Sequence, residues 1–93
     1  MARSRNNALE FSSAGSVIVA ATSDTNTTAA ANNCDAFGAI QCLQDTTFAS
    51  SASFVSTNVT GNLNSKTLGA GTILYGNFTE VKINTGLIQL HKV

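Results

Sequence analysis

The chain has 93 residues and a mass of 9.6 kDa, which allows one domain at most. Ala, Thr, Ser, Asn and Gly make up 52 of these residues, and five basic residues balance five acidic ones to a formal net charge of zero. This neutrality argues against a nucleic-acid binder, whose affinity comes from lysines and arginines that meet phosphates. It also argues against a membrane-surface peptide, and no apolar run approaches the roughly 20 residues that cross a bilayer.

The apolar core is lean, because only 25 residues are large and apolar. A chain of this length buries only about 60–65% of its unfolded surface, so small lean domains usually depend on disulfides, a metal or oligomerisation. Cys34 and Cys42 are its only cysteines, and the first residues lack the apolar stretch of a signal peptide. We therefore expect both thiols to be reduced and the chain to form a homo-oligomer.

Residues 1–13 are expected to form an extended N-terminal arm. Leu9 and Phe11 are two positions apart, which suits an extended segment with one apolar edge. Arg3 and Arg5 fit either a solvated chain start or ion pairs with carboxylates of a neighbouring subunit. We predict that these four side chains contact a partner.

Residues 14–93 are expected to form a single β domain. The run Ser16–Ala21 is short and rich in β-branched residues, which favours a strand over a helix. The stretch 22–33 contains no large apolar residue and is predicted to be a low-complexity loop. It could serve as a linker or become ordered only against another chain.

The second half of the chain alternates between strand and turn patterns. Within the strand at 37–43, Phe37, Ala39 and Leu43 are expected on one face, with Ile40 and Cys42 on the other. No stretch predicts a helix, so the chain is expected to be all-β, a small antiparallel sandwich or barrel-like domain. Further strands are predicted at 46–48, 54–56, 72–75, 78–83 and 87–93, with a turn-rich stretch at 58–64, a tight hairpin turn at 76–77 and another turn at 84–86.

No group of residues predicts catalysis or metal binding. A zinc site needs about four Cys, His or carboxylate ligands, whereas this chain has two cysteines and one histidine. His91 is expected to be an exposed residue beside Lys92, and the five carboxylates show no pairing. We therefore expect no catalytic residues, no metal and no cofactor, and we expect that the protein is not an enzyme.

Two stretches resemble small structural proteins of tailed bacteriophages. They are FGAIQCLQDTTF, residues 37–48, and TLGAGTILYGNFTEVKINTGLIQLHKV, residues 67–93. The second contains the pattern AGT-x-[LI]-Y-G-x-F-T-x-[VI] before a closing strand, although its end departs from the G-x-V-I-A-Y found in that group. The resemblance covers about 40 of the 93 residues.

The resemblance implies a virion protein assembled in the host cytoplasm, most simply a capsid decoration (cement) protein. Such a protein would dock on the assembled shell, bind the major capsid protein, associate as a homotrimer and clamp neighbouring capsomers through many weak contacts. The alternative that it implies is a tail, neck or fibre-associated protein with an attachment role. Hundreds of copies per particle would indicate decoration, and few copies would indicate the alternative.

Overall fold

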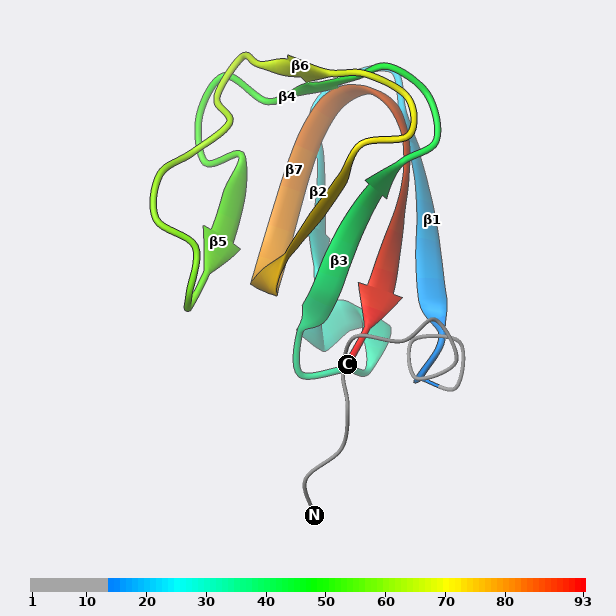
Figure 1. The fold of residues 1–93 in the computed structure, drawn as a ribbon, viewed down its shortest axis with the longest axis vertical. Coiled ribbons are helices and arrows are strands. Elements are labelled where there is room, and N and C mark those ends of the chain that lie inside the picture. Colours follow the sequence, from blue (N-terminus) through cyan, green and yellow to red (C-terminus); the bar gives the residue numbers. More distant parts are fainter. Residues whose placement is uncertain (1–13) are drawn as a thin grey trace.

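The computed structural model describes residues 14–93, which form one antiparallel sheet of seven strands (Figure 1). This confirms the predicted all-β, antiparallel fold class. The N-terminal arm predicted over 1–13 lies outside the described residues. The elements are β1 (Ser16–Ala21), β2 (Thr25–Thr28), the short 3-10 helix η1 (Ala30–Asn32), β3 (Phe37–Cys42), β4 (Thr46–Phe48), β5 (Phe54–Ser56), β6 (Thr67–Leu68) and β7 (Ile73–Lys92).

The 20-residue strand β7 organises the whole sheet, because it pairs with five of the other six strands. Figure 1 shows it passing down, then up over an arch, then down again. We call these stretches the first pass (73–76), the middle pass (78–84) and the last pass (86–92). Within the described residues the first pass pairs with β3 alone, whereas the middle and last passes have neighbours along both edges, so one long strand takes part in both layers of the molecule.

One layer contains β1, the last pass, β3 and the first pass, in that order. β1 pairs with the last pass from Ser16 opposite His91 to Ala21 opposite Gly86. β3 lies between two passes, and Ile40 stands opposite both Leu90 and Leu74. As residue numbers rise along β3, the numbers of the paired residues in β7 fall. By register, β3 therefore runs antiparallel to both the first and the last pass.

The other layer is built on the middle pass of β7. β2 pairs along one edge of this pass, from Thr25 opposite Ile83 to Thr28 opposite Glu80. β5 pairs with β7 between Phe78 and Val81, and β4 pairs with it at Ile83 and Thr85. β6 extends the sheet from β4. The sheet thus folds over itself at the bends of β7, which agrees with the predicted sandwich or barrel-like form.

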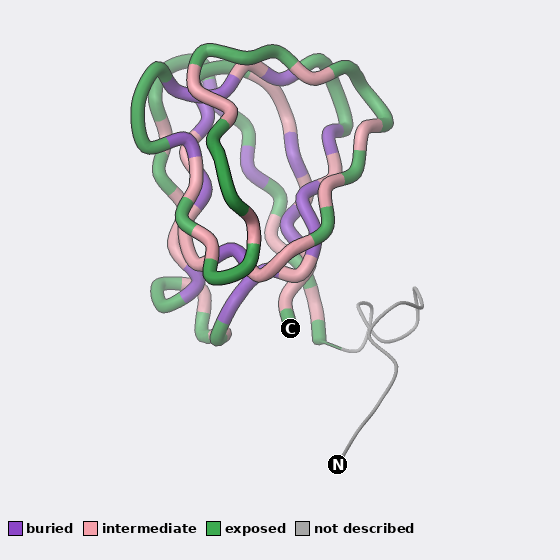
Figure 2. Tube along the Cα trace, turned by 60° about the vertical axis from the view of Figure 1, so that its left-hand side comes forward, coloured by how far each residue is buried: buried purple, intermediate pink, exposed green. Residues whose placement is uncertain are grey.

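The core lies between the two layers and consists mainly of β-branched, leucine and phenylalanine side chains. Figure 2 shows buried positions along the paired strands, and exposed positions at the bends and loops. Burying this apolar surface provides most of the stability of such a domain. The largest fully buried apolar side chains are Phe37, Phe48, Phe78, Ile40, Ile83, Ile88, Leu90 and Val81.

The structure corrects three details of the sequence prediction. The turns predicted at 76–77 and at 84–86 are wrong, because β7 continues through both stretches and changes direction without a break in the strand. Gly76 has no positive φ; an added Cβ would instead lie 2.6 Å from Val59 Cγ2, so glycine is needed for close packing. The loop predicted over 22–33 is wrong for 25–28, which form β2 because the polar strand gains ladder bonds from β7.

The third correction concerns the two faces of β3. Phe37 was expected to share a face with Ala39, but the pairing with β7 shifts register between these residues, so the alternation breaks. Phe37 joins the core with Ile40 and Cys42, while Ala39 faces the other side of the sheet. This bulge lets three large or medium apolar side chains of one short strand reach the core.

Candidate functional site

The side of the first layer that faces away from the core carries an unusual set of side chains. Strand pairing places them in two rows across β1, the last pass of β7, β3 and the first pass of β7. We call these eight residues the outer face. One row is Ile18, Gln89, Gln41 and Ile73, and the other is Ser16, His91, Ala39 and Tyr75.

The ends of both rows expose large apolar or aromatic surface. Ile18 is 56% exposed at one end of its row and Ile73 is 41% exposed at the other, while Tyr75 is 66% exposed. Single exposed apolar residues are ordinary, but several on one sheet face commonly mark a contact surface. Leu43, directly after β3, is a further exposed apolar residue of this layer. Neither row contains an acidic or basic side chain apart from the histidine.

The middle of the outer face is polar, and its groups bond to one another. The Gln89 amide Nε2 donates to Ser16 Oγ over 2.9 Å, and His91 Nε2 lies 3.1 Å from Gln41 Oε1. The amide oxygen can only accept, so this arrangement requires a proton on His91 Nε2. Because these polar groups already have partners, covering the face with another protein costs less than covering unpaired groups.

His91 is partly buried and hydrogen-bonded in the sheet, so its expected exposure is wrong. Strand pairing places it opposite both Ser16 and Ala39, and burial lowers the pKa of its imidazole below the ordinary value. The unfolded chain therefore binds more protons than the folded chain just below a pH of about 6.5. The contribution of the neutral His91 ring to the free energy of unfolding is fully present above that pH. It is lost as the pH falls towards the lowered pKa that His91 has in the folded chain.

We expect the free energy of unfolding to fall between a pH of about 7.5 and about 5.5, and His91→Gln to flatten that dependence. Urea unfolding followed by circular dichroism at several pH values measures it. An equal slope in the wild type and in the variant would contradict the assignment.

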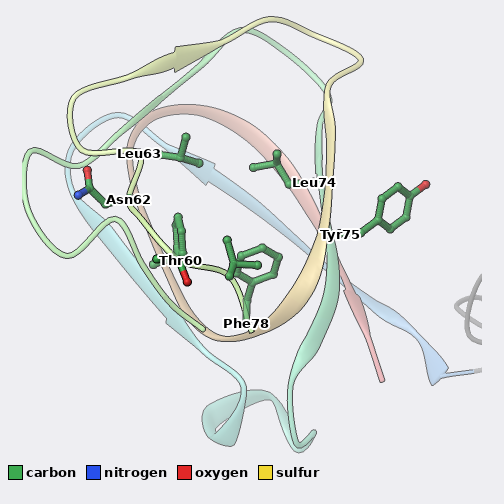
Figure 3. A pocket seen from close by; sticks show the side chains of 8 residues that line it. Thr60, Asn62, Leu63, Leu74, Tyr75 and Phe78 are labelled. Atoms are coloured by element: carbon green, nitrogen blue, oxygen red, sulfur yellow. The ribbon is translucent and has the colours of Figure 1, made fainter. Parts of the chain in front are cut away.

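A small apolar cavity lies behind the first pass of β7. Its volume is about 140 Å³, well below the roughly 300–1,000 Å³ typical of small-molecule sites. Figure 3 shows Leu63 and Leu74 projecting toward one another across it, while the Tyr75 ring points away. The loop that closes the cavity is fixed by Ser53, whose Oγ accepts the Leu63 N–H over 2.9 Å. Its lining residues are Phe54, Val59, Thr60, Asn62, Leu63, Leu74, Tyr75 and Phe78.

The two cysteines are free thiols with structural surroundings. Cys42 is buried in the core, and Cys34 is partly buried after η1, where its Sγ lies 3.5 Å from the Ala29 carbonyl oxygen. Burial raises the pKa of both thiols, so the reactive thiolate is scarce at neutral pH. Both therefore act as small apolar groups rather than as nucleophiles.

The residues singled out from the sequence and those found in the structure do not overlap. Arg3, Arg5, Leu9 and Phe11 lie outside the described residues. The outer face was missed, although the alternation of Ile73, Leu74 and Tyr75 shows that the first and third share a face. The alternation does not indicate which of the two faces of the strand packs against the core.

Across residues 14–93, no group of three or more His, Cys, Asp or Glu side chains is placed to hold a metal ion. In the same part of the chain, no helix is long and apolar enough to cross a membrane. Comparison with family models, with curated proteins and with solved structures finds no match to this chain.

Proposed function

We propose that this protein is a non-enzymatic structural protein of a virion, a capsid decoration (cement) protein that docks on the assembled shell and clamps neighbouring capsomers. The outer face supports the proposal best, because it combines exposed apolar ends with a polar centre whose groups already have partners. Such a face suits an uncharged, partly apolar protein surface. The resemblance of residues 37–48 and 67–93 to phage structural proteins supplies the virion context.

The N-terminal arm is the second contact in this proposal. Arg3 and Arg5 would pair with carboxylates of the major capsid protein, and Leu9 and Phe11 would provide an apolar edge. Many weak contacts repeated over a shell produce strong retention, because each bound copy holds its contacts at high effective concentration. Deleting residues 2–13 should weaken binding to shells while the β domain stays folded. Full-strength decoration by the truncated protein would contradict a role for the arm.

Copy number tests the proposal as a whole. Quantitative mass spectrometry of purified particles should find between about one third and one copy for each major capsid protein, because a decoration protein binds repeatedly over the whole shell. A few dozen copies or fewer would instead support the alternative, a tail, neck or fibre-associated protein. Absence from particles would contradict both virion proposals.

The outer face itself is tested by binding to preassembled shells in a sedimentation assay. The double variant Ile73→Asp with Tyr75→Asp should weaken binding at least about tenfold, because it places two charges on an apolar contact. Val55→Asp is the matched control, since Val55 is also exposed but lies on β5 in the other layer. Equal binding by the double variant and the control would show that the outer face is not the docking surface.

A further inference from the structure

The outer edge of β1 is a second candidate contact surface of the molecule. Among residues 14–93, β1 pairs only with β7, so its other edge lacks a strand partner. All six residues pair in one unbroken register, from Ser16 to Ala21. The strand contains no proline, no bulge and no charged side chain, the three features that usually protect a sheet edge from strand addition.

Backbone alternation identifies which groups face this open edge. The Lys92 N–H donates to the Gly15 carbonyl over 2.9 Å, so Gly15 and Lys92 form a hydrogen-bonded pair of the antiparallel ladder. Such pairs alternate along the ladder, so the backbone groups of Val17, Val19 and Ala21 also face β7. The N–H and carbonyl groups of Ser16, Ile18 and Ala20 therefore point away from β7, to the open edge.

We propose that two copies of this chain pair edge to edge through β1, antiparallel about a two-fold axis centred on Ile18. In this register Ile18 stands opposite its symmetry mate, and Ser16 stands opposite Ala20 of the second copy. By symmetry Ala20 also stands opposite Ser16 of the second copy, which makes three pairs. These pairs exchange about six backbone hydrogen bonds and join the first layers of the two copies into one continuous sheet.

The chemistry of the strand favours a second copy over a foreign strand. The register is self-complementary, because the same three residues supply donors and acceptors on both sides, as a two-fold interface requires. The two Ile18 side chains, now 56% exposed, would pack against each other on the joined outer faces. The chain has a formal net charge of zero, so two copies approach without mutual repulsion.

The side chains of Ser16 and Ile18 belong to the outer face, but the pairing uses the backbone groups at the edge of β1, so the inference does not depend on the proposed function. A pair can form in solution whether or not the chain binds shells. It also differs from the homotrimer expected from the sequence, because the edge pairing closes after two copies. The measured mass separates these two states.

The test uses the full chain in sedimentation equilibrium, with amide hydrogen exchange by NMR at about 5 and about 500 μM, a range that covers weak and moderate affinities. We expect the mass to rise from 9.6 kDa towards twice that value with concentration. The amides of Ile18 and Ala20 should become at least about tenfold better protected at the higher concentration, because only the second copy bonds them. The amides of Val17 and Val19 should be protected throughout.

Two variants test the edge of β1, and one of them changes Ala20, which lies outside the eight residues of the outer face. Ala20→Pro removes an N–H that faces the open edge and leaves the β7 ladder complete, so it should remain folded but monomeric. Ile18→Lys places a charge at the centre of the interface and should also be monomeric. Ile73→Lys is the matched control on the first pass of β7, and it should still pair. Circular dichroism checks that each variant folds.

Several results would overturn the proposal. A chain that stays monomeric at the higher concentration would do so, as would a mass of three chains. Protection of the Ile18 and Ala20 amides that does not depend on concentration would show that the chain covers its own edge. If pairing appears only after residues 2–13 are removed, that segment is the occupant of the edge. Pairing that persists in both edge variants would place the interface elsewhere.

Discussion

Replacing Gly86 with alanine is expected to destabilise the fold by about 2–6 kcal/mol, a large part of the roughly 5–15 kcal/mol that holds a small domain folded. Gly86 has a φ of +123°, a conformation that side chains with a Cβ disfavour. An added Cβ would also lie 2.5 Å from Thr46 Oγ1 and 2.7 Å from Thr46 Cα. Contact with a backbone atom cannot be relieved by a side-chain rotation.

Thr46 has little room to move away. It is fully buried, and its hydroxyl donates to the Gln44 carbonyl over 2.9 Å. Gly86 pairs with Ala21 of β1, and the preceding Thr85 pairs with Thr47 of β4, so a shift there would disturb both layers. The cost therefore combines about 1–3 kcal/mol of backbone strain with about 1–3 kcal/mol of overpacking.

Gly71→Ala is the matched control for this experiment. Gly71 also has a positive φ, +91°, but an added Cβ there meets nothing within 4 Å. The control should cost only the backbone strain, so its urea midpoint should fall between those of the wild type and Gly86→Ala. Equal midpoints for the two variants would show that the contact with Thr46 does not matter.

Replacing Phe78 with alanine is expected to cost about 3–5 kcal/mol. Phe78 is fully buried, and its ring packs edge-on against Phe54 with centroids 5.3 Å apart and planes at 86°. The ring also borders the cavity of about 140 Å³, so its removal would enlarge an existing void rather than allow the site to close. Urea unfolding measures the loss.

Tyr75→Ala provides the control for the second experiment. It removes an aromatic ring from the same strand, but that ring is mostly exposed and points away from the cavity. Its effect on the free energy of unfolding should stay below about 1 kcal/mol. A comparable loss in both variants would contradict the assignment of Phe78 to the core.

The predicted strands at 16–21, 46–48 and 54–56 agree with the structure because their residues are locally β-branched or aromatic and bounded by turn formers. The stretch 58–64 lacks strands, as its Asn and Gly content indicates. The turn predicted from the local sequence at Gly76 is wrong, because glycine there allows the close approach of Val59. That approach joins residues far apart in the chain, so no local window contains it.

The candidate site was less predictable than the fold. Alternation places Ile73 and Tyr75 on one face, yet which face meets the core depends on where β3 and the last pass of β7 lie. The surroundings of His91 also depend on a distant segment, because its hydrogen-bond partner Gln41 is 50 positions away. Neither the covered face nor that partner can be read from neighbouring residues.

By itself the sequence determined an all-β chain without charge excess, the positions of most of its strands and the small size of its core. These properties follow from composition and from side-chain alternation, which act over a few residues. Only the tertiary structure decided that one strand serves both layers. It also decided, among residues 14–93, which side of the first layer faces away from the core and which edge of β1 lacks a strand partner. Those features depend on pairings between distant segments, because the free energy of burial is set by the whole assembly of strands and not by any one of them.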